Sequence, residues 1–192
     1  MSDTLLPFII ISGPSGAGED SVINGLRQKL SVEVAITTVT RSPRPGESEG
    51  HPYYFVTEPA FVAGVAAGEF FEYAQHYNGN WYGLSQAEME RIKQSGKIGI
   101  FKIDYHGVAS MKRKLPGLKA IFLTAPLDVL EKRIRRRSEV TDAYVQERMA
   151  YTKEWLKHTD LYDYQVVNEE GKLEQTIIQV ENIIRLEMGL DK

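Results

Sequence analysis

The sequence predicts an α/β fold in which a parallel sheet has helices on both faces. A short buried strand leads directly into a glycine-rich turn, and apolar strand patterns then alternate with helical patterns towards the C-terminus. The chain has 192 residues, and its hydrophobic content of 42% is enough for one compact core. In such folds ligands bind beyond the carboxyl ends of the strands, so functional residues are expected in the turns there.

The elements follow in chain order from their apolar spacing. Residues 8–12 are apolar, rich in isoleucine and followed by glycine, which predicts a buried strand. Apolar residues then repeat at helical spacing between Val22 and Leu30, which predicts a helix after the turn. Residues 37–85 are rich in threonine, proline and aromatic side chains, which predicts an inserted subdomain. Further strands are predicted at residues 98–104, 118–123 and 164–167, and further helices at residues 86–93, 127–136, 142–157 and 173–187.

Composition and charge argue against several classes of protein. No apolar stretch approaches the ~18 to 20 residues of a membrane-spanning helix, and the N-terminus lacks the features of a signal peptide. The sequence therefore predicts a cytoplasmic protein with no membrane partner. The chain has no cysteine, and its four histidines show no metal-binding spacing. The net charge of −3 argues against a nucleic-acid partner despite the basic cluster at residues 133–137. The oligomeric state is left open.

Residues 13–21, Gly-Pro-Ser-Gly-Ala-Gly-Glu-Asp-Ser, form a phosphate-binding loop with altered central residues. The Walker pattern has Lys followed by Ser or Thr where this chain has Glu19 and Asp20. The glycines and the following helix N-terminus still offer backbone amides to an anion. However, a carboxylate ~4 Å from a phosphate costs about 4 kcal/mol at an effective dielectric constant of ~20. The alternatives are bridging cations, a lysine that pairs with Glu19, or an inactive nucleotide site.

Lys102 is the candidate for the missing positive charge. It lies near the end of the apolar strand predicted at residues 98–104, on the same strand face as Asp104. A lysine in such a strand needs an anionic partner, and the candidates are Glu19, Asp104 and a nucleotide phosphate. We hypothesise that Lys102 reaches the phosphates and that Asp20 or Asp104 holds Mg²⁺, directly or through water. The alternative is a salt bridge between Glu19 and Lys102 in an inactive protein.

A motif in the inserted segment resembles the guanylate kinase family. Thr40-Arg-Ser-Pro-Arg-Pro-Gly-Glu47, followed by Gly50 and Tyr53-Tyr-Phe-Val56, is similar to that family's long signature, and the similarity extends over essentially the whole chain. The resemblance implies that arginine and tyrosine side chains hold the phosphate of GMP, and that Glu72 accepts hydrogen bonds from guanine N1 and N2. The residues assigned to GMP are Thr37, Arg41, Arg44, Tyr53, Glu72, Tyr82 and Asp104.

The same resemblance implies a P-loop NTPase-type core, a GMP-binding subdomain and a helical lid within one domain of residues 1–192. The core would comprise residues 1–36, 86–127 and 158–192, the GMP-binding subdomain residues 37–85, and the lid residues 128–157. Cations stabilise charge on a transferred phosphoryl group, so catalysis is assigned to Arg41, Lys102, Arg133, Arg137 and Arg148. ATP binding is assigned to Gly13, Pro14, Ser15, Gly16, Ala17, Gly18, Glu19, Asp20, Ser21 and Asn168.

The predicted function is phosphorylation of GMP, and also of dGMP, by ATP with Mg²⁺, which yields GDP from GMP. Lys102 stands where the family has the first aspartate of Asp-Ile-Asp, so positive charge is lost from the loop and gained beside it. One alternative is an inactive guanylate-kinase-like module that binds a nucleotide or a phosphopeptide, although the retained Glu72 and lid arginines favour an enzyme. The other is a changed acceptor, because Leu84 stands where the family has Ser or Thr.

Overall fold

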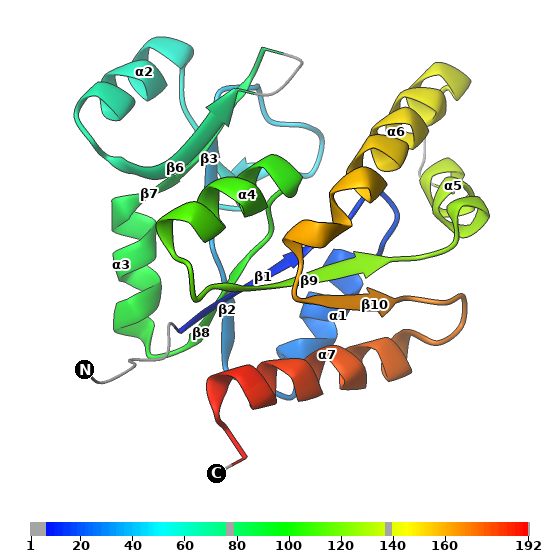
Figure 1. The fold of residues 1–192 in the computed structure, drawn as a ribbon. Coiled ribbons are helices and arrows are strands. Elements are labelled where there is room, and N and C mark those ends of the chain that lie inside the picture. Colours follow the sequence, from blue (N-terminus) through cyan, green and yellow to red (C-terminus); the bar gives the residue numbers. More distant parts are fainter. Residues whose placement is uncertain (1–6, 76–78, 137–139, 192) are drawn as a thin grey trace. The chain divides into compact units, whose positions relative to one another are not determined.

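The structure is a computed structural model that describes residues 7–75, 79–136 and 140–191 (Figure 1). It divides into two compact units, the first formed by residues 1–32 and 100–192 and the second by residues 33–99. The segment predicted to bind GMP lies inside the second unit and the segment predicted to be a lid lies inside the first, and both assignments remain predictions. Among the described residues, no helix combines the length and the apolar character needed to cross a membrane.

The sheet of the first unit has the strand order β10-β9-β1-β8-β2. Its strands are β1 (Phe8–Ser12), β2 (Val32–Val34), β8 (Ile98–Phe101), β9 (Lys119–Thr124) and β10 (Tyr164–Val167). β9 pairs in parallel with β1 on one side and with β10 on the other. All five residues of β1 are buried, as expected for a strand with helices on both of its faces. The chain passes between the two units within β2 and β8.

Helices cover both faces of this sheet, which confirms the predicted α/β fold (Figure 1). α1 and α7 pack together on one face, where a β-carbon on Gly25 would lie 2.3 Å from the side chain of Ile177. On the other face, Phe122 of β9 joins an aromatic cluster with Tyr105 and Trp155. The helices are α1 (Glu19–Leu26), α4 (Tyr105–Lys114), α5 (Leu127–Arg135), α6 (Asp142–Trp155), the 3₁₀ helix η1 (Leu156–Leu161) and α7 (Leu173–Met188).

The second unit has the strand order β4-β5-β3-β7-β6. Its elements are β3 (Thr37–Val39), β4 (Ser48–Glu49), β5 (Pro52–Phe55), α2 (Glu58–Ala66), β6 (Phe70–Gln75), β7 (Trp81–Ser85) and α3 (Gln86–Ser95). β3 pairs in parallel with β5 and antiparallel with β7, which also pairs antiparallel with β6. On the face covered by α2, Phe61 stacks on Phe70 and Trp81 with ring centroids 4.3 and 5.8 Å apart. A β-carbon on Gly83 would lie 2.8 Å from the ring of Phe61, so glycine is required there.

A network of charged side chains joins the beginning and the end of the second unit. Glu33 accepts hydrogen bonds from Nζ of Lys97 at 2.7 Å and from Nη1 of Arg91 at 3.0 Å. Arg91 also pairs with the buried carboxylate of Glu88, which accepts the amide of Ile36 at 2.8 Å. The hydrogen bond from Lys97 is the largest cause of a lowered pKa for Glu33. Residues 33 and 97 lie close to the two points where the chain passes from one unit to the other, so the network links the first and last residues of the second unit.

The end of β8 differs from the prediction. The apolar pattern predicts a strand to residue 104, but β8 ends at Phe101 and α4 begins at Tyr105. Asp104 caps this helix, since its Oδ1 accepts a hydrogen bond from the amide of Gly107 at 2.9 Å. Lys102 and Asp104 therefore lie beyond the strand, and the prediction that strand alternation puts them on one strand face is wrong. α4 itself is not predicted from the sequence.

Candidate active site

The phosphate loop connects β1 to α1 and requires glycine at three positions. Gly16 and Gly18 have φ values of +89° and +95°, a left-handed conformation that residues with a β-carbon rarely adopt. A β-carbon on Gly13 would lie 2.1 Å from the carbonyl oxygen of Leu123, and one on Gly18 would lie 2.4 Å from Nδ2 of Asn168. Glu19, Asp20 and Ser21 form the first turn of α1. The amides of such a turn have no carbonyl partners inside the helix, so the turn suits an anion.

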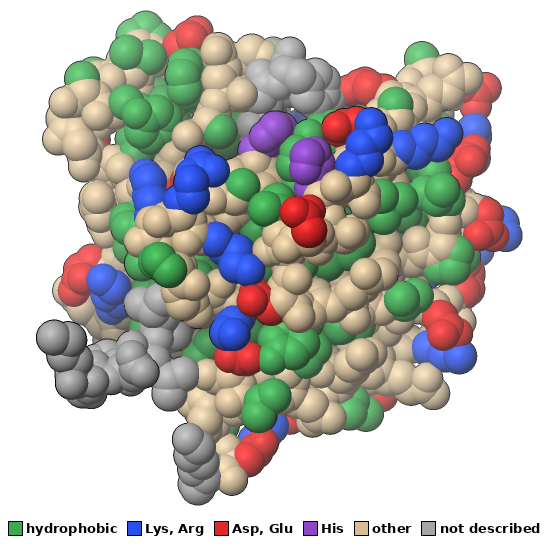
Figure 2. Space-filling view, in the orientation of Figure 1, with side chains coloured by type: hydrophobic (Ala, Val, Ile, Leu, Met, Phe, Trp, Pro, Cys, Tyr) green, Lys and Arg blue, Asp and Glu red, His purple; other side chains and the backbone are tan. Residues whose placement is uncertain are grey.

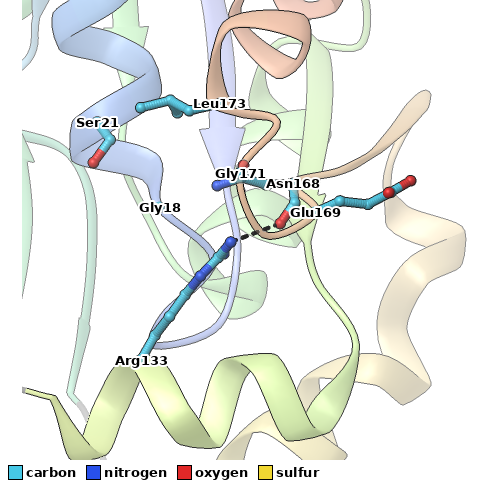
Figure 3. A pocket seen from close by; sticks show the side chains of 7 residues that line it. All are labelled: Gly18, Ser21, Arg133, Asn168, Glu169, Gly171 and Leu173. Atoms are coloured by element: carbon cyan, nitrogen blue, oxygen red, sulfur yellow. Dashed lines mark hydrogen bonds between the residues drawn. The ribbon is translucent and has the colours of Figure 1, made fainter.

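Two side chains hold the backbone of this loop from the outside. Arg133 on α5 donates to the carbonyl oxygen of Gly16 at 3.1 Å. It also donates to the carbonyl oxygen of Asn168 at 2.9 Å (Figure 3). Asn168, which follows β10 and is only 4% exposed, donates from Nδ2 to the carbonyl oxygen of Ala17 at 2.8 Å. Its Oδ1 accepts the hydroxyl of Thr176 on α7 at 3.2 Å. Arg133 and Asn168 therefore position the loop, whereas their contacts with ATP remain predictions.

A cavity of about 210 Å³ lies beside the start of α1 (Figure 3). The sequence prediction includes Gly18, Ser21, Arg133 and Asn168, but it misses the remaining lining residues, which follow β10. No motif marks them, although their place after the carboxyl end of a strand is where ligands bind in this type of fold. The lining residues are Gly18, Ser21, Arg133, Asn168, Glu169, Gly171 and Leu173.

Lys102 lies one residue beyond β8 and pairs with the first turn of α1. Its Nζ donates to Oδ1 of Asp20 at 2.7 Å, with 25% of the lysine side chain and 80% of the aspartate side chain exposed. The partners predicted from the sequence are Glu19, Asp104 and a phosphate, and Asp20 is not among them. The ammonium group nevertheless contacts the first turn of α1, the helix that follows the phosphate loop and begins at the altered Glu19.

Asp104 uses both of its carboxylate oxygens within the first unit. Oδ1 accepts the amide of Gly107, and Oδ2 accepts the hydroxyl of Tyr151 on α6 at 2.9 Å. The residue therefore links the start of α4 to α6, and its predicted contacts with GMP and Mg²⁺ remain predictions. Within the described ranges there is no group of three or more His, Cys, Asp or Glu side chains that could hold a metal ion.

In the second unit, strand register brings four of the predicted GMP residues to one face of the sheet. Thr37 pairs with Tyr53, and Val39, two residues further along β3, pairs with Tyr82. Glu72 on β6 lies opposite Leu84 on β7, which is two residues after Tyr82. Directly opposed residues, and residues two apart in a strand, point to the same face. The residues on this face include Thr37, Tyr53, Glu72, Tyr82 and Leu84, of which Glu72 is 6% exposed.

Arg41 is held in place beside the same face. Its Nη1 and Nη2 donate to the two carboxylate oxygens of Glu47 at 2.6 and 2.8 Å. The guanidinium lies over the rings of Tyr53 and Phe55, at 4.9 and 5.8 Å from their centroids. Hydrogen bonding to Glu47 raises the pKa of Arg41, and hydrogen bonding from Arg41 lowers the pKa of Glu47. Glu47, which also accepts the amide of Arg44 at 2.9 Å, therefore fixes this cation and is not among the predicted site residues.

Of the three arginines predicted for the lid, the structure describes Arg133 and Arg148. Arg133 lies at the phosphate loop, as described above. Arg148 lies on α6, where it pairs with Glu147 at 3.2 Å and its guanidinium lies 5.1 Å from the ring centroid of Tyr144. Arg137 lies outside the described residues. Their action on a transferred phosphoryl group remains a prediction.

Comparison with known proteins agrees with the motif in the second unit. The family model for guanylate kinase matches residues 7–187. The guanylate kinase of Idiomarina loihiensis is 34% identical over 187 residues, covering 95% of this chain and 88% of that protein. That of Histophilus somni is 36% identical over 182 residues, covering 93% and 86%. The crystal structure of guanylate kinase from Anaplasma phagocytophilum matches with a TM-score of 0.73 at 27% identity, covering 94% of this chain and 85% of that one. The resemblance seen in the sequence is confirmed, and the chain belongs to the guanylate kinase family.

Proposed function

We propose that the chain transfers a phosphoryl group from ATP to GMP or dGMP, and that Lys102 supplies the positive charge missing from the phosphate loop. The observation that carries the proposal is the place of the Lys102 ammonium, 2.7 Å from Oδ1 of Asp20 in the first turn of α1. Relatives of nearly the same length are named guanylate kinases, which supports an enzyme and does not favour a module that only binds.

The donor ATP would be held by the phosphate loop and by the cavity beside it. The loop amides and the partial positive charge at the start of α1 suit the phosphates, and Lys102 adds a full charge at the same turn. The adenosine end would enter the cavity, where the guanidinium of Arg133 and the side chain of Leu173 offer surfaces to a planar base. The bonds of Arg133 to Gly16 and Asn168 use two of the five N–H donors of a guanidinium.

The carboxylates in the first turn of α1 must be neutralised before a triphosphate can bind there. Without nucleotide, Lys102 offsets the charge of Asp20; with ATP bound, a magnesium ion would add positive charge between this carboxylate and the phosphates, and the ammonium would also face the phosphates. Mg²⁺ is usually held by one or two carboxylates together with phosphate oxygens and water, and the exposed carboxylate of Asp20 fits that donor set. Asp104 would contribute through water, because its two oxygens already accept hydrogen bonds. When bound, the ion would neutralise charge on the transferred group.

The acceptor GMP would lie on the sheet face of the second unit that carries Thr37, Tyr53, Glu72 and Tyr82. The Arg41 guanidinium and the tyrosine hydroxyls suit its phosphate, with Arg44 as a second cation. The carboxylate of Glu72 accepts from the N1 and N2 donors of guanine and rejects adenine, whose N1 carries a lone pair. Leu84 lies directly opposite Glu72 and offers no hydrogen bond, so discrimination between bases would rest mainly on the glutamate.

The transfer itself needs no protein nucleophile. An oxygen of the GMP phosphate forms a bond to the γ-phosphorus of ATP while the bond to the leaving ADP oxygen breaks. Catalysis consists of orientation and of charge neutralisation on the transferred group, a task assigned to Lys102, Arg41, Arg133, Arg137 and Arg148. No proton has to be taken from a phosphate oxygen that is already ionised.

A coupled assay of ADP formation tests the proposal. The purified chain is mixed with ATP, Mg²⁺ and GMP, dGMP, IMP or AMP in turn, and a reaction without acceptor corrects for hydrolysis of ATP. We expect turnover with GMP and dGMP and none above the control with AMP. Absence of ADP with every acceptor would contradict the proposal and leave the salt bridge between Lys102 and Asp20 as a feature of an inactive protein.

A further inference from the structure

The loop that carries Lys102 is attached to the base of the phosphate loop by one buried hydroxyl. Ser12 is the last residue of β1 and directly precedes Gly13, and its side chain is fully buried. Its Oγ donates to the carbonyl oxygen of Ile103 at 2.5 Å. Since β8 ends at Phe101, this bond holds the backbone next to Lys102 at a point that lies beyond the strand.

The bond from Ser12 is the last member of a chain of hydrogen bonds that begins on α6. Nε1 of Trp155 donates to the hydroxyl of Tyr162 at 2.8 Å, and that hydroxyl lies 3.0 Å from Oγ of Ser12. A serine hydroxyl has one hydrogen, which Ser12 gives to Ile103, so Tyr162 must be the donor to Ser12. The direction of the chain is therefore fixed, from the indole N–H through two hydroxyls to a backbone carbonyl.

The Tyr162 hydroxyl stays protonated at physiological pH, and burial moves its titration further away from that pH. Tyr162 lies mostly inside the protein beside Phe122, with ring centroids 5.0 Å apart, and burial raises the pKa of its hydroxyl to about 12. The phenol therefore remains protonated and able to donate. Removal of its oxygen would leave the indole N–H of Trp155 without its acceptor and Ser12 without a donor, and buried polar groups that lose partners are costly.

We propose that Tyr162 is a positioning residue for the phosphoryl transfer, acting through Ser12 and the carbonyl of Ile103 to keep the Lys102 ammonium at the phosphate loop. The inference rests on the proposed function. The Lys102 ammonium can reach only groups within the length of its side chain, so the position of the Lys102 backbone sets which phosphate oxygens it can contact. A displacement of about 1 Å in a catalytic group can lower the rate about 100-fold, which makes one backbone contact significant.

Tyr162→Phe tests the inference, with Tyr164→Phe as a matched control. Tyr164 lies two residues later on the edge strand β10, and its hydroxyl bonds to Glu187 on α7. Two strands, β9 and β1, separate β10 from β8, which Lys102 follows. We expect Tyr162→Phe to lower kcat by about tenfold to 100-fold while the KM for GMP stays within about twofold. Tyr164→Phe should leave kcat unchanged. An unchanged kcat in Tyr162→Phe overturns the inference.

A double-mutant cycle separates positioning of Lys102 from a general loss of structure. Tyr162→Phe is made in the wild-type chain and in Lys102→Met, and kcat is measured under single-turnover conditions. If Tyr162 acts through Lys102, its removal has little further effect once the ammonium is gone. Equal losses in both backgrounds assign Tyr162 a general structural role and overturn the inference. If Tyr162→Phe does not fold, Ser12→Ala is used in the cycle instead, because it removes the hydrogen bonds of the Ser12 hydroxyl to Tyr162 and Ile103.

The same double-mutant cycle is repeated with the affinity for a non-hydrolysable ATP analogue as the measured quantity. This measurement does not depend on turnover. Here too, Tyr162→Phe should weaken binding more in the wild-type chain than in Lys102→Met. A wild-type chain that binds the analogue but does not phosphorylate GMP would refute the proposed function alone. Equal effects of Tyr162→Phe on affinity in both backgrounds would refute the positioning role, whatever the outcome with GMP.

Discussion

Replacement of Lys102 by methionine is the most direct test of where the catalytic charge lies. Methionine keeps much of the apolar stem and removes the ammonium, which lies 2.7 Å from Asp20 in the structure. A unit charge ~4 Å from a phosphoryl oxygen is worth about 4 kcal/mol at an effective dielectric constant of ~20. If most of that interaction is gained in the transition state and the rest is already present with bound ATP, its loss lowers kcat by up to about 1000-fold. The coupled assay of ADP formation measures this loss at saturating ATP and GMP.

The stability of the Lys102→Met variant should change little. The partner, Asp20, is 80% exposed, and ion pairs between exposed side chains contribute about 0–1 kcal/mol. For a chain of this length, such a loss lowers the thermal midpoint by no more than about 2–4 °C. A large fall in kcat with a small fall in the midpoint therefore separates loss of catalysis from loss of fold.

A second substitution tests the position of the charge as well as its presence. Glu19→Lys places a lysine where the Walker pattern has one, and we expect it to raise the kcat of Lys102→Met by at least about tenfold. The same change in the wild-type chain should give no comparable gain, because Lys102 is already present. Turnover by Lys102→Met equal to that of the wild type would refute the reasoning.

Three further predictions address the loop, the acceptor and the pH. Gly18→Ala should lower the thermal midpoint by about 5–10 °C, and Gly96→Ala should lower it by about half as much. Both glycines have a left-handed backbone, which costs an alanine about 1–2 kcal/mol, but only the β-carbon at residue 18 would also clash with a neighbour. IMP lacks the 2-amino donor to Glu72 and keeps N1–H, so its kcat/KM should be about tenfold to 100-fold below that of GMP. Equal values would exclude recognition of the 2-amino group by this carboxylate. The pKa of Glu33 is lowered by Lys97, so its stabilisation is present above the ordinary carboxyl pKa and disappears as the pH falls through the lower folded-state value. Glu33→Gln should therefore lower the thermal midpoint by about 2–4 °C at neutral pH and by less in acid.

The strands around the phosphate loop can be predicted because a strand that is buried on both faces is a continuous run of apolar residues. The isoleucines of β1 have no polar neighbours to interrupt them, and the glycines after them mark the turn. α4 is different, because it begins where the side chain of Asp104 replaces a missing backbone partner for Gly107. A pattern of apolar residues does not reveal such a cap when the apolar strand seems to continue through it.

The site is only partly predictable for a related reason. A motif identifies residue types, but strand register decides that Thr37 and Glu72 share a face, and register depends on pairing between distant segments. The partner of Lys102 shows the same limit. Glu19 and Asp20 are adjacent in sequence, yet consecutive residues of an α-helix point about 100° apart, so the hydrogen bond from Lys102 to Asp20 can be found only once the helix is placed. The anchoring of Ala17 by Asn168 joins residues too distant in sequence for any local pattern to connect.

The division into two units gives each of them its own fluorescent reporter. The chain has two tryptophans, with Trp81 in the second unit and Trp155 in the first. Trp81 stacks on Phe61, and the indole of Trp155 donates to Tyr162, so unfolding of either unit exposes one indole to water and shifts its emission. Trp81→Phe leaves a chain that reports only on the first unit during denaturation. Coincident curves by emission and by circular dichroism would mean that the two units unfold as one cooperative body.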